Sequence, residues 1–137
     1  LLHTTVARDL ISGREPGLRA WVLKLEHPRL GLSVISQALL LESVARLPLS
    51  QQAGMMGLLQ EFFRWMAILP WDGAAASHYA RLRVESRLGQ APSSQTTDSE
   101  LMLAAHALAL DLPLVCADTR LDAIAGLQRV SWQQEVT

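Results

Sequence analysis

Residues 100–118, ELMLAAHALALDLPLVCAD, decide the fold of this chain because they join two almost wholly apolar segments. The first segment, 101–110, is apolar on nearly every side of a helix, which is typical of a buried helix. The second, 113–117, is a short apolar run, as found in strands that are covered on both faces of a parallel sheet. Glu100 and Asp118 bracket this unit. Two carboxylates in these places indicate an active-site edge.

The length and composition predict a single domain that spans residues 1–137. A chain of 137 residues buries roughly 65–70% of its unfolded surface in one core. Its content of 50% hydrophobic and 18% charged residues lies above the range of disordered chains. A net charge of −1 argues against a strongly basic surface that holds nucleic acid, although it leaves transient cleavage of RNA open.

Cysteine usage and hydropathy exclude several classes of protein. Cys116 is the only cysteine, so there is no disulfide framework, and its place in the predicted strand favours an inert core thiol. No run approaches the roughly 18 apolar residues of a membrane helix, and no leader precedes a cleavage site. We therefore expect a soluble, cytoplasmic protein with no membrane partner. The sequence begins at Leu1 and not at Met, so the first strand could be incomplete as supplied.

Hydrophobic periodicity and stop signals predict a strand and several helices in the first half of the chain. The predicted elements are a helix that ends at Ser12 and Gly13, a helix after Pro16 that Pro28 ends, a strand over 30–35, a helix over 36–47 and a longer helix capped by Ser50. Sulfur-containing and aromatic side chains gather in and after the longer helix, at Met55, Met56, Trp65 and Trp71. We interpret them as core residues, with the lining of a binding groove as the alternative.

The second half of the chain alternates strands with helices in the same way. The predicted elements are a strand-like segment over 68–72, a helix through Leu88 that Asp72 caps, a polar linker over 89–97, the unit over 100–118, a short turn or helix over 119–124 and a last strand over 127–132. Strands and helices that alternate at this spacing predict crossover connections, a mainly parallel sheet and helices on both of its faces.

Several local signatures follow one another in a fixed order along nearly the whole chain. They are Leu1 to Thr5 (LLHTT), residues 32–39 (LSVISQAL), residues 69–72 (LPWD), residues 104–110 (AAHALAL) and residues 114–118 (LVCAD). In this order they resemble the PIN-domain family and, within it, the VapC-like toxins of bacterial toxin–antitoxin pairs. The run 104–110 is the most specific. The resemblance implies an α/β fold, a PIN-like three-layer sandwich, and usually a metal-dependent ribonuclease.

The same resemblance implies an acidic site in which three or four carboxylates hold Mg²⁺ or Mn²⁺, which activates water and neutralises the phosphate under attack. The first two of these positions are degenerate here. His3 stands at the first, and imidazole suits transition metals better than Mg²⁺. Leu39 stands at the second and has no ligand atom. The third and fourth positions keep a carboxylate, as Glu100 and Asp118.

Each acidic residue also has a structural interpretation. Glu100 completes a capping box with Thr97, and Asp118 is placed to cap the turn that follows it. Glu42 lies one helical turn beyond Leu39 and could reach the site, unless a salt bridge or solvent holds it. The further candidates near the two carboxylates are Asp98 and Asp122.

The resemblance, together with the two positions that lack a carboxylate, leads to two alternative functions. The first is a VapC-like ribonuclease that uses Mg²⁺ or Mn²⁺ and whose activity is weak or lost because of His3 and Leu39. The second is a catalytically silent PIN-fold module, without a metal, that forms a homodimer and binds an antitoxin-like peptide in an apolar groove. RNA is the substrate in the first case, and the partner in the second is an antitoxin protein.

Overall fold

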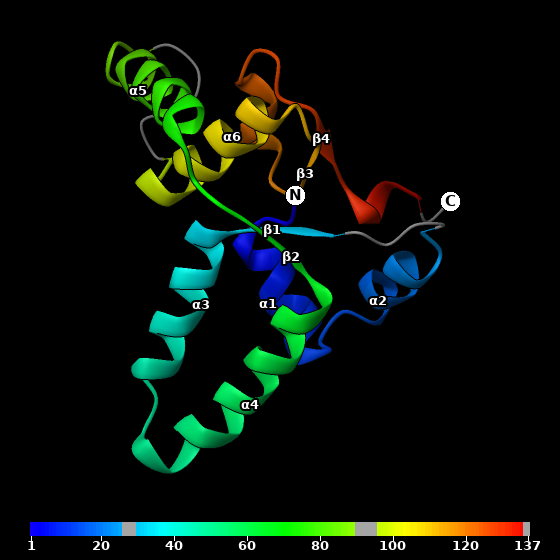
Figure 1. The fold of residues 1–137 in the computed structure, drawn as a ribbon. Coiled ribbons are helices and arrows are strands. Elements are labelled where there is room, and N and C mark those ends of the chain that lie inside the picture. The colour runs from blue at the N-terminus through cyan, green and yellow to red at the C-terminus, as the bar shows by residue number, and fades with distance from the viewer. Residues whose placement is uncertain (26–29, 90–95, 136–137) are drawn as a thin grey trace.

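The computed structural model describes residues 1–25, 30–89 and 96–135 of the chain (Figure 1). Its sheet is built from parallel pairs. Strand β1 (Gly31–Ser33) pairs with β2 (Ala67–Leu69), and β3 (Leu114–Val115) pairs with β4 (Arg129–Val130). Leu2 forms parallel bridges to Leu32 and to Val115 and so joins the two pairs. The order across the sheet is therefore β2, β1, Leu2, β3 and β4, and the predicted parallel sheet is confirmed.

Backbone hydrogen bonds hold the start of the chain in the middle of this sheet. The amide of Leu2 donates to the carbonyl of Gly31 over 2.9 Å, and the amide of His3 donates to the carbonyl of Val115 over 3.0 Å. The Leu2 side chain is fully buried. The apolar pair that opens the chain thus lies at the centre of the sheet, in agreement with the apolar character of parallel strands that are covered on both faces.

The first helix ends at Ser12 and Gly13 as the sequence predicts, whereas the next three begin earlier or end earlier than predicted. The four helices are α1 (Thr4–Ser12), α2 (Pro16–Leu23), α3 (Val34–Ala45) and α4 (Leu49–Trp65). Helix α3 begins at Val34 and shortens the predicted strand, because the Ser33 hydroxyl accepts a hydrogen bond from the Ile35 amide and caps it. The predicted cap at Ser50 is wrong, since α4 begins directly after Pro48 and Ser50 lies in its first turn. Pro28 lies outside the described residues.

The elements of the second half agree better with their prediction. They are α5 (Gly73–Arg87), α6 (Asp98–Leu110) and two 3₁₀ helices, η1 (Thr119–Ala123) and η2 (Trp132–Glu135). Asp72 caps α5, with its Oδ1 accepting from the Ala75 amide over 3.0 Å. The predicted linker over 89–97 falls largely outside the described residues.

The core divides into two clusters that meet at the sheet. One gathers Leu2, Leu18, Leu32 and Leu40 with the apolar sides of α1 to α4. The other surrounds α6, whose six buried residues are Leu101, Leu103, Ala104, Ala105, His106 and Ala107. Helix α5 packs along α6 at one end of the molecule, and the hairpin of α3 and α4 extends at the other (Figure 1). The prediction that 101–110 is a buried helix is confirmed.

In the part of the chain that the structure describes, no helix combines the length and apolar character that crossing a membrane requires.

Candidate functional site

The candidate site lies at the carboxyl ends of the parallel strands. His3 follows the bridge at Leu2, and Asp118 follows β3 after two further residues. Glu100 comes to the same place from the first turn of α6. In open α/β sheets, ligands bind where the carboxyl ends of the strands meet, so this edge is the place to look for chemistry.

Glu100 is held by the capping box that the sequence predicts. The Thr97 hydroxyl accepts from the Glu100 amide over 3.3 Å, and Oε2 of Glu100 accepts from the Thr97 amide over 3.2 Å. These bonds satisfy two amides that the first turn of a helix leaves without partners. The other carboxylate oxygen, Oε1, faces Arg120 at 3.7 Å from Nη2. One carboxylate oxygen therefore stabilises the start of the helix, and the other faces the guanidinium of Arg120.

Asp118 caps the 3₁₀ helix η1 and forms hydrogen bonds and an ion pair with the side chain of Arg120. Its Oδ1 accepts from the Arg120 amide over 2.9 Å, which is the cap that the sequence predicts. Nε of Arg120 lies 3.0 Å from both carboxylate oxygens, and Nη2 lies 2.5 Å from Oδ2. The hydrogen bonds from this guanidinium lower the pKa of Asp118. The carboxylate is thus ionised over the whole physiological range.

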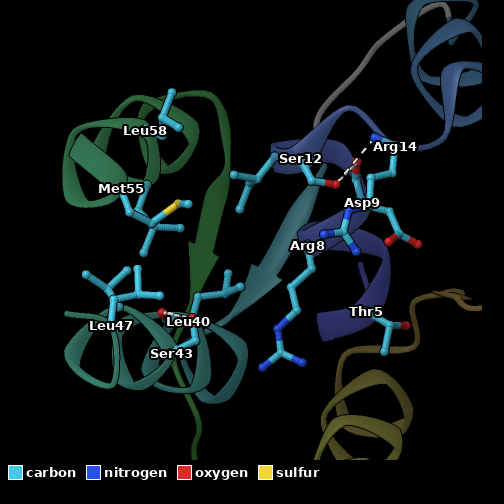
Figure 2. Close-up of a pocket in the computed structure, with 13 residues that line it drawn as sticks. Thr5, Arg8, Asp9, Ser12, Arg14, Leu40, Ser43, Leu47, Met55 and Leu58 are labelled. Carbon is cyan, nitrogen blue, oxygen red and sulfur yellow. Dashed lines mark hydrogen bonds between the residues drawn. The ribbon is translucent and has the colours of Figure 1, made fainter. Parts of the chain in front are cut away.

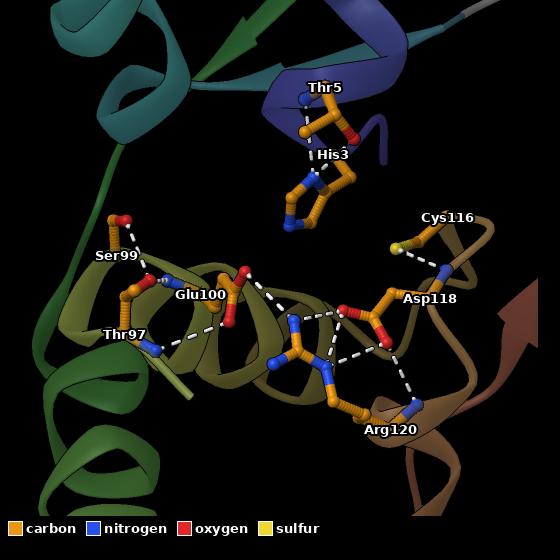
Figure 3. A network of polar contacts seen from close by, with 8 residues as sticks. All are labelled: His3, Thr5, Thr97, Ser99, Glu100, Cys116, Asp118 and Arg120. Carbon is orange, nitrogen blue, oxygen red and sulfur yellow. Dashed lines mark hydrogen bonds and ion pairs between the residues drawn. The ribbon is translucent and has the colours of Figure 1, made fainter. Parts of the chain in front are cut away.

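Arg120 is the member of this site that the sequence does not predict. Its guanidinium lies between Glu100 and Asp118 and forms an ion pair with each (Figure 3). The only signal in the sequence is a cation two residues after a capping acid, at the start of a short turn. That pattern is common on protein surfaces and does not by itself indicate a second carboxylate.

His3 is buried beside the two carboxylates and faces the space between them (Figure 3). Its Nδ1 accepts from the Thr5 amide over 3.2 Å and lies 2.9 Å from the Thr5 hydroxyl, so the ring caps α1. The neutral tautomer with the proton on Nε2 satisfies these contacts. Burial lowers the pKa of His3, and the charges of Glu100 and Asp118 oppose this shift. His3 is therefore a neutral neighbour of the acid pair.

The structure gives the remaining candidate acids partners of their own. Glu42 pairs with Arg46 over 2.6 Å on α3, and both side chains are exposed. The other two pairs are Asp98 with Arg83 at 3.2 Å, next to a hydrogen bond from Tyr79, and Asp122 with Arg129 at 2.6 Å. Leu39 is half-buried in the middle of α3 and offers no ligand atom.

The side chains at this edge do not fit a divalent metal as they are arranged. Over residues 1–25, 30–89 and 96–135, no three His, Cys, Asp or Glu side chains converge as a metal-binding group. Mg²⁺ prefers a near-octahedral set of oxygen ligands. Of the four positions that the sequence resemblance implies, Glu100 and Asp118 are the two that offer carboxylate oxygens, and both face the guanidinium of Arg120. Cys116 is buried next to them and burial raises the pKa of its thiol.

A polar network ties this edge to α6. The Ser33 hydroxyl lies 2.8 Å from Nδ1 of His106, and Nε2 of His106 lies 3.0 Å from the carbonyl of Pro70. Because a carbonyl only accepts, Nε2 carries the proton and Nδ1 accepts from Ser33. Both side chains are fully buried. The pair is therefore structural: it links β1, α6 and the segment after β2.

An apolar groove of about 620 Å³ lies between α1, α3 and α4 (Figure 2). Its apolar lining consists of Ile11, Leu40, Val44, Leu47, Met55, Leu58 and Leu59. Thr5 lines this groove, and its hydroxyl lies 2.9 Å from Nδ1 of His3 at the acidic edge. Of the residues interpreted as core, Met55 instead lines this groove and Trp65 is exposed, whereas Met56 and Trp71 pack against the core clusters.

Comparisons with known proteins identify the fold. A scan against family models and a search of curated proteins returned no match. Among solved structures, the chain is similar to VapBC2 from Rickettsia felis bound to a promoter DNA fragment, with a TM-score of 0.84 and 20% identity over 96% of both chains. DNA-bound VapBC from Salmonella typhimurium gives a TM-score of 0.82 and 22% identity, again over 96% of both chains. FitAcB from Neisseria gonorrhoeae gives 0.79 and 24% over the same share.

Proposed function

We propose that this chain is a VapC-like PIN-fold protein of a toxin–antitoxin type system, and that binding a partner helix is its main capacity. The groove between α1, α3 and α4 carries this proposal, because it adjoins the acidic edge in a fold shared with VapBC and FitAB structures. Those structures contain a second kind of chain, and some of them contain DNA. An antitoxin-like protein is the corresponding partner here.

The chemistry of the groove favours an amphipathic helix with an acidic flank. Its floor is apolar, and Met55 and Leu58 remain exposed on α4, the latter at 55%. Exposed side chains of this kind are anchors for the apolar face of a partner helix. On the opposite rim, Arg8 and Arg14 form no ion pair with any described residue. An acidic side chain of the partner would form an ion pair with one of these two arginines.

Metal-dependent ribonuclease activity, which the family resemblance implies, is weak or lost in this proposal. His3 and Leu39 remove two of the four acidic positions, and losing negative ligands weakens the binding of a divalent cation. The retained pair of Glu100 and Asp118 would hold the metal and RNA would be the substrate if any activity remains. RNA cleavage that requires Mg²⁺ or Mn²⁺ and is abolished by Asp118→Ala would overturn this part of the proposal.

Phage display of a helical peptide library on the purified protein tests the groove. We expect selected peptides to carry apolar residues at i, i+3 or i+4 and i+7 with at least one acidic residue. Their binding should fall at least tenfold with Leu58→Lys. The matched control is Leu49→Lys, which lies on the same helix at 86% exposure and outside the groove. Peptides that bind Leu58→Lys as well as they bind the unchanged protein would contradict the assignment.

Expression of the protein alone in bacteria distinguishes a partner-binding protein from an active ribonuclease. We expect normal growth, because the acidic set is incomplete. Growth arrest that depends on Asp118 would favour the active ribonuclease instead. The double variant His3→Asp and Leu39→Glu supplies the two missing carboxylates. If this variant arrests growth and the unchanged protein does not, Glu100 and Asp118 are still able to support cleavage.

Several further features of the proposal come with the family resemblance. They are a single domain over residues 1–137, a three-layer arrangement with helices on both faces of the sheet, a homodimer and a cytoplasmic location. Light scattering at micromolar concentration tests the dimer, for which a mass near twice the 15.1 kDa of one chain is expected.

A further inference from the structure

We propose that Arg120 is a built-in counter-charge that takes the place of a divalent cation between Glu100 and Asp118. This inference deepens the proposed function at the acidic edge, and it rests on that function only where it equates this edge with the metal site of PIN domains. The ion pairs themselves are independent of any partner. As a consequence, Arg120 offsets part of the negative charge of Glu100 and Asp118 and blocks the access of a metal ion to their oxygens.

The contacts of Arg120 show why it competes with a metal. Its guanidinium meets both oxygens of Asp118 and the free oxygen of Glu100. These are the oxygen atoms that a cation shared by the two carboxylates would need. A planar guanidinium binds a carboxylate through two parallel hydrogen bonds, which is stronger and more directional than contact with a single ammonium. A metal must therefore displace Arg120 before it can reach Asp118.

The charges around the site leave little attraction for a second cation. Glu100, Asp118 and Arg120 together carry one net negative charge. The other candidate acids, Glu42, Asp98 and Asp122, are each paired with an arginine of their own. Removing the guanidinium of Arg120 would restore two negative charges that face the same space.

The local backbone does not depend on this guanidinium. Asp118 caps η1 through the amide of residue 120, and that amide is present whatever the side chain. Glu100 keeps its capping bonds with Thr97. A variant at position 120 should therefore keep the position of both carboxylates, so Arg120 can be replaced without rebuilding the site.

Titration calorimetry with Mn²⁺ alone tests the proposal on the unchanged protein, Arg120→Ala and Arg120→Gln. We expect no binding to the unchanged protein up to about 1 mM Mn²⁺, and binding to both variants at least tenfold tighter than this limit. Adding Asp118→Asn to either variant should abolish the gain. Circular dichroism checks folding, and the glutamine variant, which keeps most of the length of the side chain, serves if the alanine variant does not fold.

The matched control is Arg46→Ala, which frees the single carboxylate of Glu42 elsewhere on the surface and should leave Mn²⁺ binding unchanged. Submillimolar binding of Mn²⁺ by the unchanged protein would overturn the inference. The inference also fails if Arg120→Ala and Arg120→Gln gain no affinity, or if their gain survives Asp118→Asn. Selection of groove-binding peptides does not involve Arg120, so failure of this inference and failure of the proposed function give different results.

Discussion

His106 offers the sharpest test of how the core holds the strand ends in place. It is 1% exposed, accepts from Ser33 and donates to the carbonyl of Pro70. Its ring also meets the edge of Trp71, with centroids 5.8 Å apart. His106→Leu has a similar size but no polar atoms, so it leaves buried polar partners without a hydrogen bond. At about 1–3 kcal/mol for each of these two groups, we expect a loss of about 2–6 kcal/mol of unfolding free energy at about pH 7.5.

The size of this loss should depend on pH in a defined direction. Burial lowers the pKa of His106 below 6.5, so the folded protein keeps the ring neutral where the unfolded chain protonates it. The stabilisation by His106 is therefore fully present above pH 6.5 and declines as the pH falls toward the folded pKa, by up to about 1.4 kcal/mol per pH unit. The difference between the unchanged protein and His106→Leu should shrink accordingly between about pH 7.5 and about pH 5.5.

Urea unfolding followed by tryptophan fluorescence at several pH values across this range measures the difference. The pKa of His3, which burial also lowers, contributes equally to both proteins and cancels, whereas the charge of the Leu1 amino group acts on His106 and is part of the measured difference. The control is His78→Leu, the same change on a residue of α5 outside the core, for which we expect an effect within about 0.5 kcal/mol. A difference that stays constant with pH, or a cost no larger than that of His78→Leu, would refute the assigned tautomer and hydrogen bonds.

Four further substitutions, one of them a control, probe the packing and the helix ends. Leu59→Ala, in the buried part of α4, should cost about 2–5 kcal/mol in a urea titration, whereas Leu58→Ala, one residue away and exposed, should cost less than about 1 kcal/mol. Thr97→Ala removes one half of the capping box and should cost about 0.5–2 kcal/mol, seen as a lower midpoint of thermal unfolding. Gly13 ends α1 at a φ of 68°, so Gly13→Ala should cost about 1–2 kcal/mol in the same assay.

The second half of the fold follows well from the sequence because its signals are local. The capping box at Thr97, the cap at Asp72 and the apolar pattern over 101–110 each depend on residues within a few positions of one another. Hydrogen bonds of this kind join residues that are close in sequence, so the local pattern is enough to predict them. The beginning of α3 differs from its prediction because Ser33 belongs to a strand and also caps the next helix, and one residue cannot show both roles in its pattern.

The candidate site can be predicted only in part because its decisive contacts are long-range. Glu100 and Asp118 lie at the expected edge, since parallel strands bring their carboxyl ends together. Ser33 and His106 are 73 residues apart in sequence, and no local pattern pairs them. The broad apolar stripe of α4 indicates burial, yet only Leu59 is buried in that helix, because the groove leaves the neighbouring side chains uncovered.

The acidic edge and the groove are connected through the first turn of α1. His3 caps that helix and faces the carboxylates, while Thr5, its hydrogen-bond partner, lines the groove. A partner helix seated against Thr5 would therefore lie within reach of the ring of His3 without entering the space that Arg120 holds. Here Arg120 already offsets one of the two negative charges of the pair, so the partner's contacts can be apolar residues in the groove and acidic residues at the two arginines of its rim.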